Sequence, residues 1–146
     1  MRSIKQEGID LIKFFEGFES KIYLDAAGLS TIGYGHLLRA GEDEMFKNGI
    51  SPEAGEALLI KDILSAETAV LRLIHVPLTD GQFDALVSFT FNLGSGALQR
   101  STLRRKVNRE EHDEVPVEFH KWVWVGGRKL KGLMNRREAE AELYQL

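Results

Sequence analysis

Residues 22–36 have the sequence IYLDAAGLSTIGYGH and mark a change in the pattern of the chain. Two short runs rich in β-branched and aromatic residues, 22–24 and 29–35, flank the turn-forming sequence 25–28. Such runs on either side of a glycine-containing turn are typical of antiparallel strands. The stretch therefore predicts a small antiparallel sheet near the N-terminus.

The segments next to this sheet have other patterns. Ser3 and Gln6 have the spacing of a capping box, so a first helix is expected over about 4–15, and Gly17 is placed to end it. Residues 39–50 are polar and acidic and are expected to form a surface loop with a short turn.

Helical spacing dominates the rest of the chain. Ser51 is expected to cap a long helix that begins at Pro52, and a capping box at Thr79 predicts another helix that stops at Gly94. Shorter helices are expected at about 101–108 and 116–125. After Gly126 and Gly127, a final amphipathic helix is expected to bury Leu130, Leu133, Met134, Ala141 and Tyr144.

The two tryptophans lie close together in the sequence. Trp122 and Trp124 are two residues apart and cannot share a helix face, so one is expected to pack inward while the other reaches a groove or solvent.

Length and composition favour one folded domain. The chain has 146 residues, of which 43% are hydrophobic, and no cysteine, which excludes a disulfide framework and any site built on thiolates. The expected fold class is α+β, with a sheet-containing lobe at about 13–50 and a larger helical lobe made of 1–12 and 51–146. Its active-site cleft is expected between the lobes.

Charge is unevenly distributed along the chain. Residues 1–99 carry 8 Lys/Arg and 14 Asp/Glu, a net charge of −6, whereas residues 100–146 carry 11 and 8, a net charge of +3. This basic half could follow an anionic polymer such as nucleic acid or a cell-wall surface, but the excess is too weak to predict nucleic-acid binding. The N-terminus lacks the apolar run of a signal peptide, so synthesis in the cytosol is expected.

Two carboxylates are candidates for chemistry. Glu16 falls at the C-terminal end of the first helix, beside Phe14, Phe15 and Phe18, and both the helix dipole and apolar neighbours favour the protonated form that a general acid needs. Asp25 opens a turn in which amides and water can keep it ionised. Two carboxyl groups in such different environments suit cleavage of a glycosidic bond, although most carboxylates at helix ends and turns are solvated surface groups.

Motifs along nearly the whole chain add to this pair. They are the Glu16-x8-Asp25-x5-Thr31 spacing, the run 31–36 (TIGYGH), and the segments 79–89 (TDGQFDALVSF), 91–96 (FNLGSG), 101–103 (STL) and 132–138 (GLMNRRE). In their order and spacing they resemble the phage-type lysozymes, the endolysins of glycoside hydrolase family 24. The resemblance implies a lysozyme-like fold and a muramidase that cleaves the β-1,4 bond between N-acetylmuramic acid and N-acetylglucosamine in peptidoglycan.

The resemblance also assigns catalytic roles. It implies that Glu16 is the general acid, Asp25 the second carboxylate and Thr31 the residue that helps to hold the attacking water. The family is usually described as inverting, for which the two carboxyl groups are expected about 6.5 to 9.5 Å apart. No cofactor and no metal site are expected.

Further substrate-binding candidates come from the same comparison: Gly35, His36, Leu37, Phe91, Asn92 and Thr102. Gly33 and Gly35 are interpreted either as room for a glycan near the backbone or as a bulge. For Phe91 a place in the core is the competing interpretation. By comparison with the family, His36 is expected to pair with Asp62 and so tie the sheet to the helical lobe.

Two other functions stay open: a non-catalytic wall-binding protein on the same scaffold, and a lytic transglycosylase. The expected partner is the peptidoglycan glycan strand, with no nucleic acid and no stable membrane insertion, and a monomer is favoured. The enzyme is expected to wait in the host cytoplasm until a separate pore-forming protein gives it access to the periplasm and wall.

Overall fold

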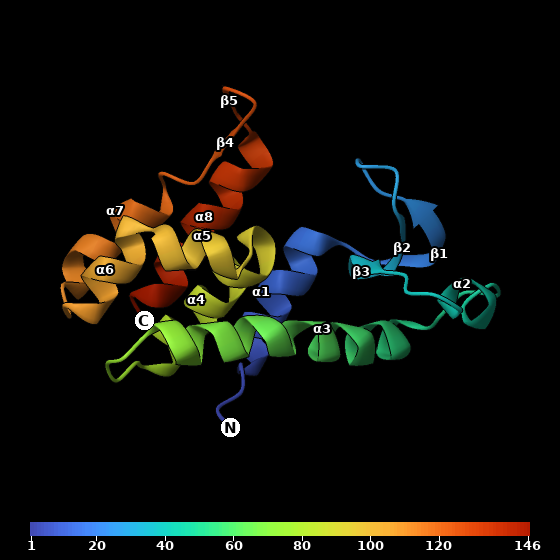
Figure 1. Cartoon of the computed structure of the whole chain (residues 1–146), viewed down its shortest axis with the longest axis horizontal. Helices are drawn as coiled ribbons and strands as arrows, with labels where there is room; N and C mark the ends of the chain where they lie inside the picture. Colours follow the sequence, from blue (N-terminus) through green and yellow to red (C-terminus); the bar gives the residue numbers. More distant parts are fainter. The chain divides into compact units, whose positions relative to one another are not determined.

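The computed structural model describes residues 1–146, which form two compact units. The sheet unit comprises Ile12–Leu64, and the helical unit comprises Met1–Leu11 and Ser65–Leu146. Helices α1 (Gln6–Glu16) and α3 (Pro52–Leu73) contribute residues to both (Figure 1). Compared with the expected lobe of residues 13–50, the sheet unit also includes the first half of α3.

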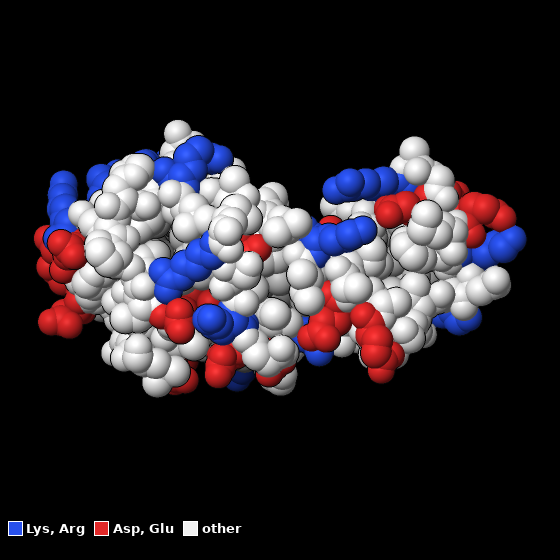
Figure 2. Space-filling view, turned by 90° about the horizontal axis from the view of Figure 1, so that it is seen from below, with Lys and Arg blue, Asp and Glu red and all other residues white.

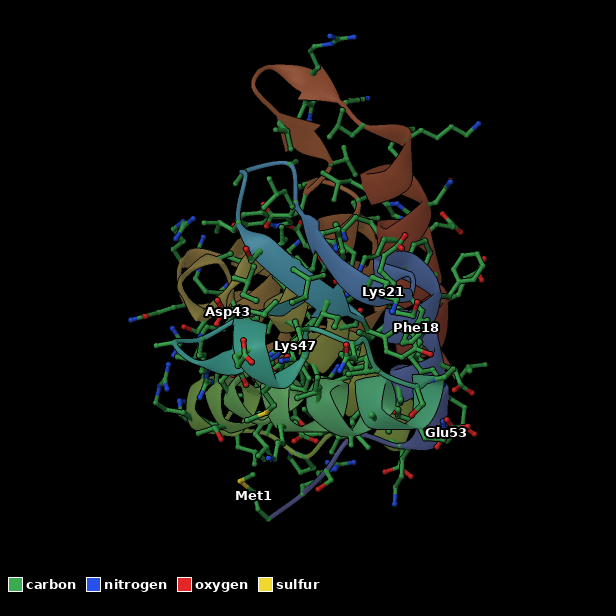
Figure 3. All side chains as sticks on the ribbon, turned by 90° about the vertical axis from the view of Figure 1, so that its right-hand side faces the viewer. Met1, Phe18, Lys21, Asp43, Lys47 and Glu53 are labelled. Carbon is green, nitrogen blue, oxygen red and sulfur yellow. The ribbon has the colours of Figure 1, made fainter.

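The sheet unit contains three antiparallel strands in the order β1-β2-β3. They are β1 (Glu19–Leu24), β2 (Ser30–Gly33) and β3 (His36–Leu37), and a short helix, α2 (Glu42–Met45), follows in the segment expected to be a loop. Phe18, which is labelled in Figure 3, packs against Tyr34, with ring centroids 5.1 Å apart, and lies beside Gly55 of α3. The predicted small antiparallel sheet and mainly helical remainder are confirmed.

The start of α1 differs from the prediction. The helix begins at Gln6, and Ser3 does not cap it, because buried acids bind the backbone amides at this end instead. The amide of Ile4 donates to Glu67 Oε2 at 2.6 Å, and the amide of Lys5 donates to both carboxylate oxygens of Asp84 at 3.2 Å. These partners are more than sixty residues away in sequence, so local spacing could not reveal them. Gly17 ends the helix as expected, with φ of 73°.

The helical unit is built around α4 (Asp80–Leu93), of which residues 83–90 are all buried. The Thr79 capping box is present, and α4 packs against α5 (Ser95–Arg100) and α8 (Lys131–Tyr144). Three further helices come between α5 and α8 in the sequence. They are α6 (Thr102–Asn108), which is capped by Ser101, the 3-10 helix η1 (His112–Glu114) and α7 (Val115–Phe119). Phe89 and Phe119 meet edge to face with centroids 5.7 Å apart in the core of this unit.

The predicted helix over 116–125 is wrong in its second half. Helix α7 ends at Phe119, and β4 (Trp124–Val125) pairs with β5 (Arg128–Lys129) as a hairpin. Gly126 and Gly127 both have positive φ, 56° and 79°, which is the conformation of a tight turn that matches strand twist. The tryptophan prediction is confirmed: Trp122 packs against Phe89, and Trp124 is 56% exposed.

The final helix is present, but its buried face differs from the prediction. Ala141 and Tyr144 are buried as expected, whereas Leu130 and Met134 are exposed. The buried face of α8 instead includes Arg136, Arg137 and Glu140. A buried ion-pair network thus replaces part of the expected apolar stripe. None of the helices combines the length and the apolar character needed to cross a membrane.

Candidate active site

The three predicted catalytic residues all lie in the sheet unit, on consecutive elements. Glu16 is the last residue of α1, Asp25 follows directly after β1, and Thr31 is the second residue of β2. A helix end, a turn and a strand therefore supply one side chain each.

The Glu16 carboxylate lies against the turn between β2 and β3. A Cβ atom built on Gly35 would stand only 2.8 Å from Glu16 Oε1, and Gly35 has φ of 74°. Phe14 does not surround this carboxylate as expected, because its ring is 79% exposed and meets Phe15 edge to face. Gly35 thus has a role that the sequence did not show: it leaves room for the Glu16 side chain.

Asp25 is held by its own turn. Its Oδ1 accepts hydrogen bonds from the amides of Ala27 and Leu29, both at 2.9 Å. The Asp25 backbone amide in turn donates to the Leu29 carbonyl oxygen, and Gly28 donates to the Asp25 carbonyl oxygen. Because both side-chain bonds reach the same oxygen, the turn fixes the orientation of the carboxylate without another side chain.

Thr31 is buried within the sheet, at 2% exposure, and its hydroxyl donates to the Leu29 carbonyl oxygen at 2.9 Å. Its partner across the strands is Tyr23. The pKa of Tyr23 is raised by partial burial and then by the negative charges of Glu19, Glu16 and Asp25. The Tyr23 side chain therefore lies within the field of both predicted catalytic carboxylates.

Sequence reasoning did not select Tyr23 as a site residue. The signal was available in part, because Tyr23 is two residues before Asp25 and an antiparallel turn over 25–28 places it opposite Thr31. Side chains of directly opposed residues share one face of a sheet. The strand register, which the sequence left open, was needed to complete that inference.

The predicted pair of His36 and Asp62 is present, with His36 Nδ1 and Asp62 Oδ2 2.7 Å apart. Glu42 of α2, which was not predicted, lies 3.0 Å from His36 Nε2. All three belong to the sheet unit, so the pair connects β3 to the first half of α3 within that unit. Burial lowers the pKa of His36, but the hydrogen bonds and charges of Asp62 and Glu42 outweigh it and raise the pKa overall.

The remaining candidates are divided between the units. Leu37 is half exposed on β3. Phe91 and Asn92 lie near the end of α4, where Phe91 is half-buried and the Asn92 side-chain oxygen accepts a hydrogen bond from Arg137. Thr102 is exposed at the start of α6, and its hydroxyl accepts from Arg105 at 2.8 Å.

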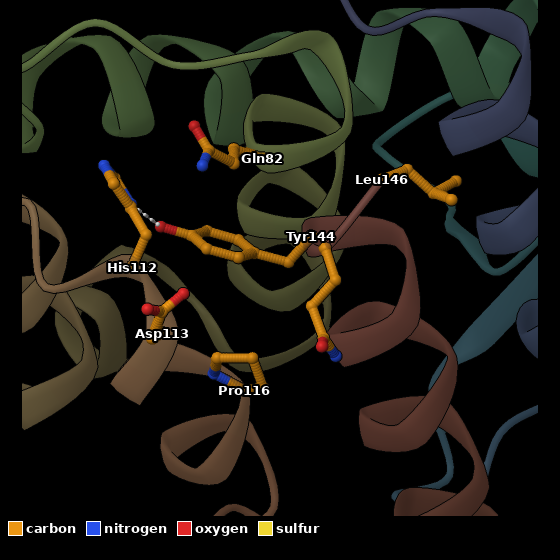
Figure 4. Close-up of a pocket in the computed structure, with 7 residues that line it drawn as sticks. Gln82, His112, Asp113, Pro116, Tyr144 and Leu146 are labelled. Atoms are coloured by element: carbon orange, nitrogen blue, oxygen red, sulfur yellow. Dashed lines mark hydrogen bonds between the residues drawn. The ribbon is translucent and has the colours of Figure 1, made fainter.

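A pocket of about 270 Å³ lies within the helical unit (Figure 4). Gln82, Asp113, His112 and Tyr144 contribute to its lining, and His112 Nδ1 lies 2.7 Å from the Tyr144 hydroxyl. None of the predicted site residues lines this pocket.

Comparisons with known proteins show the family of the chain. The sequence model of the family described as phage lysozyme matches residues 13–140. The chain is 42% identical to an endolysin of Bacillus phage B103 over 97% of its own length, but it spans only 54% of that relative. It is also similar to a solved mutant of P22 lysozyme, with a TM-score of 0.90, 32% identity and full coverage of both chains.

A further solved relative is the muramidase domain of SpmX from Asticaccaulis excentricus. This structure superposes with a TM-score of 0.88 and 36% identity over 100% of this chain and 99% of that one. The predicted lysozyme-like fold is confirmed by these matches.

Proposed function

Because the chain belongs to the phage lysozyme family, we propose that it is an endolysin that hydrolyses peptidoglycan. The bond cleaved is the β-1,4 linkage between N-acetylmuramic acid and N-acetylglucosamine. Glu16 is the general acid, Asp25 the second carboxylate beside the anomeric carbon, and Thr31 the residue that holds the attacking water.

The observation that carries this proposal is that Tyr23 lies opposite Thr31 in the sheet and within the field of both acids. Its pKa responds to the charges of both Glu16 and Asp25, and it stands opposite Thr31 in the sheet. The three proposed catalytic residues thus all lie near Tyr23 in the sheet unit. Glycoside hydrolysis requires two carboxyl groups that act on a single sugar ring, and Glu16 and Asp25 are proposed as that pair.

Each side chain has surroundings that suit its proposed role. The Glu16 carboxyl faces the Gly35 backbone, so no side chain at residue 35 stands between this acid and a glycosidic oxygen. Asp25 accepts two backbone amides through Oδ1, and Oδ2 can then face the anomeric carbon or a water. The Thr31 hydroxyl gives its proton to Leu29, which leaves its lone pairs to accept a hydrogen bond from the attacking water.

The same proposal covers substrate and location. Phe91, Asn92, Thr102, Gly35, His36 and Leu37 are proposed to contact the glycan. We expect the enzyme to be held in the host cytoplasm until a separate pore-forming protein admits it to the periplasm and wall, and to act there as a monomer.

The test is turbidity clearing of chloroform-treated Gram-negative cells by purified protein. We expect Glu16→Gln to lower the clearing rate by at least about 100-fold, the usual loss when a general acid is removed. Glu19→Gln is the matched control, because Glu19 is an exposed acid three residues away on β1. If Glu16→Gln cleared cells at close to the wild-type rate, the mechanism would be refuted.

Product analysis separates hydrolysis from the transglycosylase alternative. Mass spectrometry of digested wall should give muropeptides with a free reducing end, formed by addition of water. Anhydro-muramyl ends would instead show a lytic transglycosylase. If wild-type protein bound wall without releasing either product, it would be a non-catalytic wall-binding protein.

A further inference from the structure

Positive charge is concentrated in one segment of the helical unit. Residues 119–137 contain six Lys/Arg and no Asp or Glu, whereas residues 109–118 contain five Asp/Glu and one Arg. This contrasts with the face seen in Figure 2, where basic and acidic side chains are interspersed. Arg136 and Arg137 are buried with Glu140, so the exposed part of this charge belongs to residues 121–134, here called the cationic hairpin segment.

The cationic hairpin segment has an unusual composition. Between Lys121 and Met134 it contains only Gly, Trp, Val, Leu and Met besides Lys and Arg. Its exposed apolar side chains are Trp124, Val125, Leu130 and Met134, which are 42% to 56% exposed. Apolar and cationic side chains therefore occur together in a segment that offers no hydroxyl, amide or carboxylate side chain.

The hairpin holds the side chains of β4 and β5 away from the core. β4 and β5 pair only with each other, both strands are exposed throughout, and the hairpin extends beyond α7 and α8 in Figure 1. Trp124 opposes Lys129, whose Nζ lies 5.2 Å from the centre of the indole ring.

The base of the hairpin is anchored in the helical unit. Val123 is buried, the Leu130 amide donates to the Val123 carbonyl oxygen, and Trp122 packs on Phe89. None of Arg128, Lys129 and Lys131 forms an ion pair with an acid. The segment is thus an anchored projection in which Arg128, Lys129 and Lys131 are available to an external anion, whereas Lys121 pairs with Glu118.

We propose that the cationic hairpin segment docks on an anionic lipid surface. Trp124 and the neighbouring aliphatic side chains enter the boundary between headgroups and acyl chains, and Arg128, Lys129 and Lys131 lie at the lipid phosphates. A glycan partner would require hydrogen-bonding side chains for its hydroxyl groups, and the segment has none apart from its cations and the indole N–H groups. The proposal does not depend on the hydrolytic function.

The experiment uses the full chain and two kinds of vesicle, phosphatidylcholine alone and phosphatidylcholine with phosphatidylglycerol at about 3:1. We expect co-sedimentation only with the anionic vesicles, and weaker binding at higher salt. Trp122→Phe leaves Trp124 as the single tryptophan, and its emission should shift to shorter wavelength on binding. If that variant folds poorly, co-sedimentation of the unchanged protein still tests the proposal.

Two triple variants isolate the role of the hairpin. Arg128→Gln/Lys129→Gln/Lys131→Gln should weaken vesicle binding on the order of 100-fold, from about fivefold per cation near an anionic surface. The control Lys61→Gln/Arg72→Gln/Arg100→Gln removes the same charge from exposed positions elsewhere and should bind like wild type.

Three results would overturn the proposal. One is no binding of the wild type to anionic vesicles at 50 mM salt. Another is an equal loss in both triple variants, which would show an effect of net charge alone. The third is hairpin-dependent binding to isolated cell wall with none to vesicles, which would make this segment a wall contact.

Discussion

Glu16 at the end of α1 and Gly35 in the turn between β2 and β3 are in such close approach that a Cβ atom at residue 35 would stand 2.8 Å from Glu16 Oε1. We expect Gly35→Ala to displace the carboxyl group and to strain a backbone with φ of 74°. Displacement of a catalytic group by about 1 Å can cost about 100-fold in rate, so the clearing assay should show a loss of that order.

Gly41→Ala is the control for this prediction. Gly41 has φ of 85°, and a Cβ atom there would contact nothing within 4 Å, so the variant carries the backbone strain without the clash. Equal losses of activity in the two variants would show that strain, and not the position of Glu16, accounts for the effect.

The contacts of His36 with Asp62 and Glu42 make stability depend on pH. The pKa of His36 is raised in the folded state. Its contribution to the free energy of unfolding is therefore complete below the unfolded pKa of about 6.5 and is lost as pH rises through the folded pKa. Asp62→Asn should therefore lower the free energy of unfolding by about 1 to 2 kcal/mol at pH 5.5 and by less at pH 8. Urea denaturation at the two pH values measures this, and equal stability of variant and wild type at pH 5.5 would refute it.

Asp84 gives a pH dependence of its own. Burial raises its pKa to about 6, against the opposing hydrogen bonds from the Lys5 and Gly8 amides. The folded state therefore holds the proton of the Asp84 carboxyl group more tightly than the unfolded chain does. The stability that this proton provides is complete below about pH 4 and is lost as pH rises through 6. The stability of wild type relative to Asp84→Asn should fall by about 2 to 3 kcal/mol between pH 4 and pH 7. A difference that stays constant over this range would contradict the assignment.

The buried network on α8 should be sensitive to the loss of one partner. Arg137 Nε lies 2.9 Å from Glu140 Oε1, both side chains are fully buried, and Ser88 donates to Glu140 Oε2 at 2.6 Å. Glu140→Gln leaves the arginine charge buried without its anion, and we expect a loss of about 3 to 5 kcal/mol in the free energy of unfolding. Glu138→Gln, at an exposed position on the same helix, should change it by less than about 1 kcal/mol. Similar losses in the two variants would argue against the network.

Local chemistry accounts for the features that sequence predicted well. The Thr79 capping box, the Ser51 cap and the turn at 25–28 are formed by residues within four positions of one another, so their spacing is sufficient evidence. The family resemblance added the pair of His36 and Asp62.

Predictions failed where distant residues decide the structure. The start of α1 depends on Glu67 and Asp84, and the buried face of α8 depends on Ser88 and Asn92 of α4. The sequence predicts a helix over 116–125, but residues 124–129 form a hairpin, because two consecutive glycines suit a tight turn as well as a helix stop. Glu42 was missed beside His36 because the segment 39–50 was expected to be a loop.

The way in which Asp25 is held has a practical consequence. Its carboxylate takes its orientation from the amides of Ala27 and Leu29, so the side chains of the exposed Ala26 and Ala27 are not needed for it. The chain has no cysteine, and Ala26→Cys would therefore introduce a unique thiol next to the proposed catalytic carboxylate. A fluorophore or spin label attached there would report the arrival of a glycan by spectroscopy, without any need for turnover.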